Sequence, residues 1–219
     1  ETLVHTTLHG WPALPGAPQW LASRLDQPSV DFTARGRGLV LGLCEEVPLD
    51  VSLRPGAVAF VDWLLQQRPS LEVAVYTAGT PQYAGQVLNQ LGLSGLRWTL
   101  FRDSCEPLGL PLTKDLTKLR FDLSRVVLVD NSEKSFWLQP QNGLLVSDWD
   151  GSHPSEKELE RVRDALEQLL DVEDVRKALP GLSPAAEESS MSWDKTLKKS
   201  SLFLTFFALA AWIVAWASN

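Results

Sequence analysis

Apolar positions alternate between helical and strand spacing from residue 54 onward. Within residues 57–67 the apolar side chains recur at helical spacing, and the short apolar run Leu71–Tyr76 predicts a buried parallel strand. Thr80 and Pro81 form a helix start, with Thr80 as the cap and Pro81 at the first helical position. The helix they open is expected to stop at Gly92.

The same alternation continues in the second half of the chain. Residues 125–129 and 143–146 predict two more buried strands, and residues 155–170 predict a helix that opens with a capping box of Ser155 and Glu158. Strands that alternate with helices predict parallel β-α-β units. The expected fold class is therefore α/β, with a three-layer parallel sheet, over residues 1–178.

The N-terminal part follows a different pattern. Residues 10–18 are irregular and hold Pro, Gly and Trp, and Gly38–Leu43 is a short strand-like run. We expect residues 6–53 to form a small β insertion. Residues 179–200 have no periodicity and are largely small and polar, so they are expected to form a linker.

An apolar segment at residues 201–218 follows this linker. As a helix, Leu202–Ala217 would span about 24 Å, somewhat less than the hydrocarbon core of about 30 Å. Trp212 and Trp216 suit a membrane interface, and the lysines before the segment place the preceding domain in the cytosol. We expect a single-pass tail anchor in the endoplasmic reticulum, nuclear envelope or outer mitochondrial membrane; a buried core helix is the alternative.

Composition narrows the choice of function. The net charge of −7 and a pI near 5.0 argue against general nucleic-acid binding, which favours a basic face. Cys44 and Cys105 lie far apart and suggest no disulfide framework, and the histidines are scattered rather than at zinc spacing. The sequence gives no sign of the oligomeric state.

Polar residues follow the predicted strands where an open α/β sheet binds its ligands. Thr77 follows the strand at 71–76, Asp130 and Asn131 follow the strand at 125–129, and Lys114 lies between them. A hydroxyl and an ammonium suit phosphate oxygens, and Asp and Asn oxygens suit Mg²⁺. Each also has an ordinary alternative as a cap, a solvated charge or a turn. Their order along the chain favours a common site.

Four separated blocks resemble one known family. They are Val73–Thr80, Leu100–Cys105, Thr113–Leu119 and Val126–Ser132, and Leu53–Gly56 matches the segment before that family's first core helix. In order and spacing these blocks resemble the small C-terminal-domain phosphatases of the haloacid dehalogenase superfamily and their nuclear-envelope relatives. The resemblance covers about residues 1–178 and implies a phosphatase fold of that type.

The resemblance also bears on the first residues of the chain. The family uses an Asp-x-Asp-x-Thr motif, in which the first Asp attacks phosphorus and the second is the general acid and base. Leu-Val-His typically follows that motif, and this sequence begins Glu1-Thr2-Leu-Val-His. Glu1 and Thr2 therefore resemble the last two motif residues, and both catalytic Asp residues are expected upstream of Glu1. On this interpretation the chain as given is inactive; a frayed terminus is the alternative.

The resemblance assigns roles to five further residues. Thr77 would bind phosphate through its hydroxyl, and Lys114 would neutralise the phosphoryl group. Asp130 and Asn131 would belong to a Mg²⁺ site, with Asn131 the more direct ligand. Arg102 resembles an arginine near the active-site entrance, and a structural ion pair is its alternative. The insertion at 6–53 is longer than the family's, so substrate choice does not carry over.

Two functions of different classes follow from these patterns. The first is a Mg²⁺-dependent phosphatase that acts on phosphoserine or phosphothreonine in a protein at a membrane surface, with a lipid or small-molecule phosphatase as a variant. The second is a non-catalytic module that resembles the mitochondrial import receptor of the same superfamily. That receptor tends to lose the Asp-Asn pair and carries its membrane segment before the domain. The retained Asp130-Asn131 pair and the C-terminal apolar segment favour the enzyme.

Overall fold

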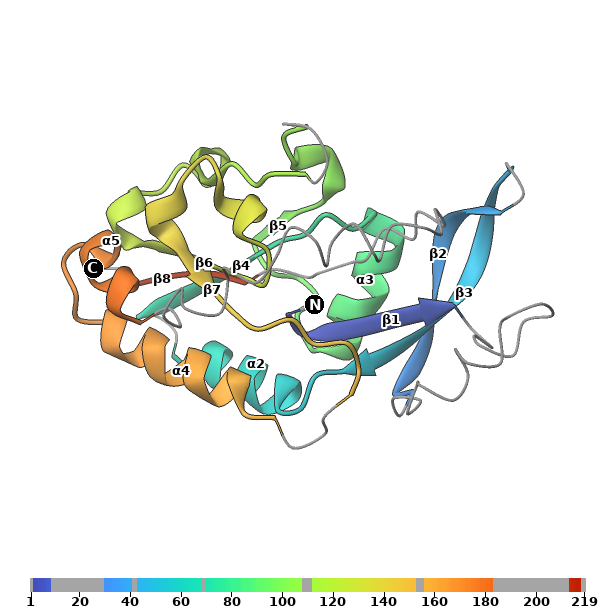
Figure 1. Ribbon diagram of the computed structural model, residues 1–219, viewed down its shortest axis with the longest axis horizontal. Helices are drawn as coiled ribbons and strands as arrows, with labels where there is room; N and C mark the ends of the chain where they lie inside the picture. The colour runs from blue at the N-terminus through green and yellow to red at the C-terminus, as the bar shows by residue number, and fades with distance from the viewer. Residues whose placement is uncertain are drawn as a thin grey trace, which may run out of the picture.

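A five-stranded sheet and a three-stranded sheet make up the frame of the molecule in a computed structural model (Figure 1). The structure describes residues 2–8, 30–40, 43–67, 70–107, 112–152, 156–182 and 213–217. The strand order of the larger sheet is β5-β4-β8-β6-β7. Its strands are β4 (Leu71–Tyr76), β5 (Trp98–Leu100), β6 (Val126–Asp130), β7 (Gly143–Leu145) and β8 (Ile213–Ala217).

The direction of β8 differs from that of its neighbours. β4 pairs with β5, and β6 with β7, in parallel, as the sequence predicts. β8 lies between β4 and β6 and runs antiparallel to both. The sheet is therefore mixed rather than wholly parallel, because a C-terminal segment fills the position at its centre.

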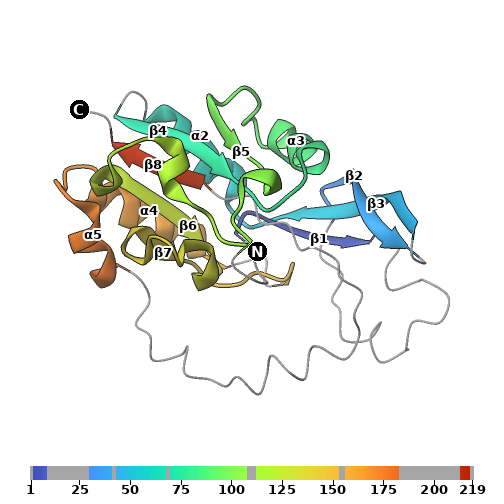
Figure 2. The same ribbon diagram turned by 90° about the horizontal axis from the view of Figure 1, so that it is seen from above.

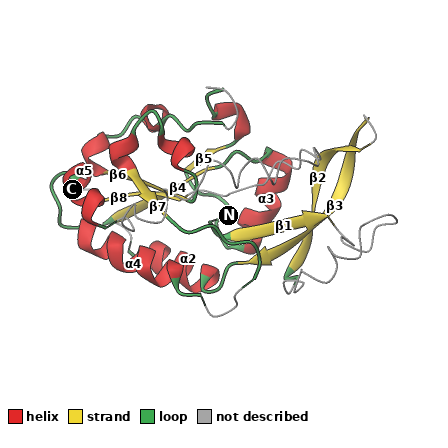
Figure 3. Cartoon of the chain, in the orientation of Figure 1, coloured by secondary structure: helices red, strands yellow, loops and turns green. Residues whose placement is uncertain are grey.

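Helices cover the faces of the sheet (Figure 3). The α-helices are α2 (Ala57–Gln66), α3 (Pro81–Gln90), α4 (Glu158–Leu169) and α5 (Val175–Ala178). The 3-10 turns are η1 (Arg102–Ser104), η2 (Leu116–Leu119), η3 (Leu123–Arg125), η4 (Glu133–Phe136), η5 (Pro140–Asn142) and η6 (Leu179–Gly181). The helices predicted at 57–67 and from Pro81 are confirmed.

Two apolar layers form the core, one on each side of the sheet. Val73 and Val75 of β4 pack with buried side chains of α2, α3 and α4. The residues between and after them, Ala74 and Tyr76, face the other layer, which holds apolar side chains of η2 and η4. Because strand side chains point alternately to opposite faces, a strand buried on both sides is apolar throughout. The three-layer arrangement predicted from the sequence is thus confirmed.

The β insertion forms an antiparallel sheet of order β1-β3-β2 that extends away from the helices (Figures 1 and 2). Its strands are β1 (Val4–Leu8), β2 (Phe32–Val40) and β3 (Leu43–Leu53). Helix α3 lies against β2. The Gln86 side-chain oxygen accepts from the Arg35 N–H, and the Gln86 side-chain nitrogen donates to the Arg35 carbonyl. The insertion is therefore tied to the α/β core.

The start of α4 differs from the sequence prediction. The helix begins at Glu158, its N-cap residue is Lys157 without a side-chain cap, and Ser155 lies outside the described residues. The Glu158 carboxylate accepts from the Ser147 N–H at 2.8 Å and from Arg161 at 2.7 Å. The predicted capping box is wrong about Glu158, because these other donors occupy its carboxylate.

Two predictions concern the C-terminal part. Leu179, placed by the sequence in the linker, is buried against the helical layer, so the packed domain extends past it. Residues Ile213–Ala217 form strand β8, not part of the predicted membrane helix, and residues 201–212 and 218–219 lie outside the described part. No helix among the described residues is long and apolar enough to cross a membrane.

Candidate active site

The predicted site residues come off the same edge of the larger sheet. Val75 of β4 and Val129 of β6 both lie opposite Ile213 of β8. Thr77, two residues after Val75, and Asn131, two residues after Val129, therefore leave the sheet at the same level. Their strands are separated only by β8, which amounts to about 10 Å at a strand spacing of about 4.8 Å.

Lys114 and Asp130 form a buried ion pair at this edge. The Lys114 Nζ donates to Asp130 Oδ2 at 2.7 Å, and the two residues are 1% and 0% exposed. Burial lowers the pKa of Lys114 to about 7, although Asp130 opposes the change. Asp130 Oδ1 also accepts from the Ser132 N–H at 2.6 Å. The carboxylate is therefore fully engaged within the fold.

Three contacts hold the loop that carries Lys114. The Lys114 N–H donates to the Ser135 carbonyl at 2.9 Å, and the Thr113 hydroxyl donates to the Lys134 carbonyl at 3.1 Å. On the other side, the Asp115 N–H donates to the Tyr76 hydroxyl at 3.3 Å. Lys114 thus reaches Asp130 from a segment without regular helix or strand, fixed between β4 and the turn after β6.

Thr77 occupies a tight turn at the end of β4. Its side chain is fully buried, and its hydroxyl oxygen accepts from the Gly79 N–H at 3.0 Å. Arg102 braces the same turn, since its Nε donates to the Ala78 carbonyl at 2.6 Å and its backbone N–H donates to the Gly79 carbonyl at 3.0 Å. Half-burial lowers the pKa of the Arg102 guanidinium. The contacts place Arg102 beside the turn that carries Thr77.

Thr2 contacts Asn131 at the end of β6, on the side of β8 opposite to β4 and Thr77. The Thr2 hydroxyl donates to Asn131 Oδ1 at 3.2 Å, and Asn131 Nδ2 donates to Asp148 Oδ1. Thr2 is buried, and its carbonyl accepts from the guanidinium of Arg54 at 3.2 Å. The start of β1 is therefore held at the carboxyl edge of the sheet, beside the residues predicted to bind a metal.

Oxygen atoms near Asn131 suit a hard cation. The Asn131 amide oxygen, the exposed Asp148 carboxylate and the Thr2 hydroxyl are the kind of donors that Mg²⁺ takes, and Mg²⁺ commonly keeps several waters beside one or two protein ligands. No group of three or more His, Cys, Asp or Glu side chains suited to a metal gathers among the described residues. The donor chemistry therefore fits Mg²⁺ with few protein ligands.

The sequence analysis missed Asp148, Tyr76 and Arg54 as parts of this region. Asp148 follows β7 by three positions, so the rule that ligands bind beyond strand ends could have found it. Tyr76 and Arg54 had no such signal. Tyr76 reads as one more apolar strand residue, and the contacts of Arg54 come from segments far apart in the sequence.

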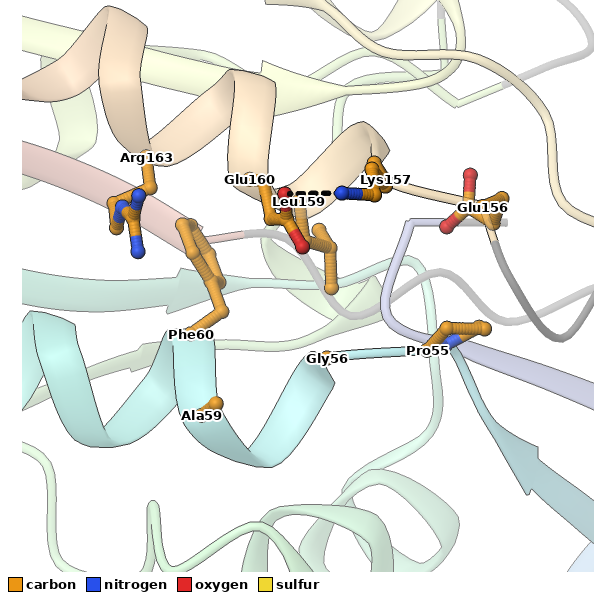
Figure 4. A pocket seen from close by; sticks show the side chains of 9 residues that line it. All are labelled: Pro55, Gly56, Ala59, Phe60, Glu156, Lys157, Leu159, Glu160 and Arg163. Atoms are coloured by element: carbon orange, nitrogen blue, oxygen red, sulfur yellow. Dashed lines mark ion pairs between the residues drawn. The ribbon is translucent and has the colours of Figure 1, made fainter.

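A separate hollow of about 480 Å³ lies between the first turns of α2 and α4 (Figure 4). It contains none of the predicted site residues. Its lining is Pro55, Gly56, Ala59, Phe60, Glu156, Lys157, Leu159, Glu160 and Arg163. The chemistry predicted from the sequence lies at the sheet edge, and not in this hollow.

The fold is similar to solved structures of an RNA polymerase II CTD phosphatase. "The Structure of Fcp1, an essential RNA polymerase II CTD phosphatase" matches with a TM-score of 0.58 at 18% identity, over 82% of this chain and 67% of that one. Fission yeast Fcp1-R271A bound to beryllium fluoride matches with a TM-score of 0.57 at 17% identity. At this identity the likeness shows the class of fold alone, an α/β domain of the kind found in those structures.

The family follows from the sequence. The model of the NLI interacting factor-like phosphatase family matches residues 1–176, and the chain belongs to this family. The resemblance to the haloacid dehalogenase-type phosphatases of the C-terminal-domain branch is thereby confirmed.

Curated relatives come from two groups. CTD small phosphatase-like protein 2 of Dictyostelium discoideum is 36% identical over 118 residues, 53% of this chain and 21% of that protein. Human carboxy-terminal domain RNA polymerase II polypeptide A small phosphatase 1 is 37% identical over 121 residues, 54% of this chain and 46% of that protein. Mitochondrial import inner membrane translocase subunit tim50 of Emericella nidulans is 36% identical over 132 residues, 59% of this chain and 24% of that protein. The chain spans less than half of each relative.

Proposed function

We propose that this chain is the main part of a Mg²⁺-dependent phosphatase that removes phosphate from serine or threonine in proteins. The observation that carries the proposal is the convergence of Thr77, the Lys114–Asp130 pair and the Thr2–Asn131 contact at one edge of the sheet. Fold and family support the reaction class, and the proposed substrate rests on the similarity to the phosphatase relatives.

Thr77 and Lys114 would hold the phosphoryl group. The Thr77 hydroxyl oxygen accepts from the Gly79 N–H, and a hydroxyl is also a donor of the kind that binds a phosphate oxygen. Lys114 carries a full positive charge below a pH of about 7, and a bound phosphate dianion would favour that charged form further. The salt bridge to Asp130 holds the ammonium in place before substrate arrives, so little reorganisation is needed.

Asn131 would hold the metal through its amide oxygen, with Thr2 beside it. A Mg²⁺ ion would neutralise charge on the phosphate oxygens. Of the two Asp residues that the family uses, the general acid and base is proposed to adjoin Glu1 on its N-terminal side, and the nucleophile to lie two residues earlier. Thr2 contacts Asn131 at the carboxyl edge of the sheet, so residues joined to that end of β1 would be near the proposed metal and phosphate.

The test uses the full-length protein and an aryl phosphate, with and without Mg²⁺. Replacing Thr77 with valine keeps the shape of the buried side chain but removes its hydroxyl, and should lower kcat by about a hundredfold. Ser52→Ala removes another buried hydroxyl, on β3, and is expected to leave activity as it was. Equal rates for Thr77→Val and Ser52→Ala, or full activity without Mg²⁺, would contradict the proposal.

A second candidate is a binding module of the import-receptor type. The 36% identity to a tim50 protein is as high as that to a small phosphatase, and it favours this candidate independently. The coding sequence before Glu1 separates the two. Asp immediately before Glu1 and again two residues earlier supports catalysis, whereas other residues there support the binding module.

Membrane attachment through residues 201–218 is a further proposal. It competes with the fold for five residues, because Ile213–Ala217 cannot form both β8 and part of a membrane helix at one time. Carbonate extraction of membranes from cells that express the full-length protein, or the protein lacking residues 201–218, tests it. Release of the full-length protein by carbonate would exclude the anchor.

A further inference from the structure

The Asn131 side chain belongs to a closed ring of hydrogen-bonded residues. Starting from Thr2, the ring passes through the Asn131 side chain to Asp148 and along the backbone to Ser147. Arg54 closes it, because its Nη1 donates both to the Ser147 carbonyl at 3.0 Å and to the Thr2 carbonyl at 3.2 Å. The loop after β7 passes close to the start of β1 in two views of the molecule (Figures 1 and 2).

Asp148 is exposed, but the residue before it is tightly held. Ser147 donates its N–H to Glu158 at 2.8 Å, and its carbonyl and its hydroxyl oxygen accept from Arg54 at 3.0 and 2.8 Å. Arg54 is itself fixed by Glu156, with Nε to Oε1 at 2.6 Å and Nη2 to Oε2 at 2.9 Å. Glu156 lies at the end of the hollow near Pro55 (Figure 4). The position of Asp148 is therefore set by the fold.

The contact with Asp148 determines which way the Asn131 amide faces. A carboxylate oxygen can only accept, so it selects the NH₂ end of the amide. The amide oxygen then faces the Thr2 hydroxyl, which donates to it. Without Asp148, the two ends of the amide could exchange, and the amide oxygen would face its site only part of the time.

We propose that Asp148 is a positioning residue that directs the amide oxygen of Asn131 toward a divalent cation. This rests on the proposed function, since Asn131 is the ligand that it assigns to Mg²⁺. Partners that orient a metal ligand typically change metal affinity by about 10- to 100-fold when they are removed. The contacts of Ser147 with the buried Arg54 and with Glu158 hold Asp148 in place despite its exposure.

The experiment measures Mg²⁺ binding to the full-length protein by calorimetry. Asp148→Ala should weaken Mg²⁺ binding by about tenfold or more, whereas Asp148→Asn keeps an oxygen acceptor and should stay within about threefold of the wild type. Asp150→Ala is the matched control. Asp150 is an exposed carboxylate of the same loop that accepts from Ser152 instead of Asn131.

A second readout needs no metal. The side-chain NH₂ signal of Asn131, assigned by its loss in Asn131→Ala, should shift in Asp148→Ala and not in Asp150→Ala. An unchanged signal, or equal Mg²⁺ affinity in these two variants, overturns the inference. Equal losses of Mg²⁺ affinity in Asp148→Ala and Asp148→Asn also overturn the inference, because the charge of Asp148 rather than the orientation of the Asn131 amide would then determine the affinity. A wild-type protein that binds no Mg²⁺ overturns the inference together with the metal part of the proposed function, whereas failure of Asp148→Ala alone leaves that function standing.

Discussion

Replacing Lys114 with methionine leaves the Asp130 carboxylate buried without its cation. At the observed 2.7 Å and an effective dielectric constant of about 20, the attraction between the two charges is about 6 kcal/mol. Both ions lose hydration on burial, which offsets much of that attraction. Removing one partner leaves the hydration loss of the other uncompensated, so we expect the free energy of unfolding to fall by about 3–5 kcal/mol. That is a large part of a typical total of about 5–15 kcal/mol.

The loss of stability in Lys114→Met should depend on pH in a defined direction. Burial raises the pKa of Asp130, and removing the ammonium removes the main opposing influence. Between its ordinary pKa and that raised value, the folded variant binds more protons than the unfolded chain. Its stability therefore falls as pH rises through this window. The difference from the wild type should be larger at about pH 6 than at about pH 4, and both values lie below the pKa of about 7 at which Lys114 itself loses its charge.

Urea unfolding at those two pH values measures the effect. The double variant Lys114→Met/Asp130→Asn removes both charges but keeps the oxygen that accepts from Ser132, and should regain at least half of the lost stability. Lys118→Met is the control. Its ion pair with Glu106 lies at the surface, so the substitution should lower the free energy of unfolding by no more than about 1 kcal/mol. A loss below about 1 kcal/mol for Lys114→Met at about pH 6, or a double variant no more stable than the single one, would refute the reasoning.

Three other predictions follow from described contacts. Tyr76→Phe removes the hydroxyl that accepts from the Asp115 N–H, and should lower the free energy of unfolding by about 1–3 kcal/mol in urea titrations. Gly143→Ala places a Cβ 2.6 Å from the ring of the buried Phe136, and should lower the free energy of unfolding in urea titrations by about 1–3 kcal/mol. Sulfate binding, measured by calorimetry, should weaken by about tenfold from about pH 6 to about pH 8, because Lys114 loses its charge around a pKa of about 7 while sulfate keeps its own.

Each of these has a control. Gly181→Ala meets no atom within 4 Å and should leave stability nearly unchanged, so an equal loss at both glycines would argue against the packing explanation. For Tyr76→Phe, a stability equal to that of the wild type would mean that the hydroxyl does not hold the Lys114 loop. For sulfate, Lys114→Met should bind weakly at both pH values, and an affinity that rises with pH would contradict the assignment.

The sequence by itself determined the elements and part of the site. The runs Val73–Tyr76 and Val126–Val129 are apolar at every position because each strand is covered on both faces, and that pattern is local. Thr77 and Asp130 were found because they directly follow such strands. The helix boundaries at Ala57 and Pro81 were likewise predicted from local spacing and capping.

Only the tertiary structure decided the partners. Lys114 meets Asp130 because turns on both sides fix its loop. The contact of Arg54 with Glu156 joins segments 102 residues apart, and that of Asn131 with Asp148 joins two different strand ends, which no local pattern encodes. Tertiary structure also decided whether Ile213–Ala217 forms a helix or a strand. An apolar run suits a membrane helix or a buried strand equally well, and the unpaired backbone edges of β4 and β6 supply the hydrogen bonds that favour the strand.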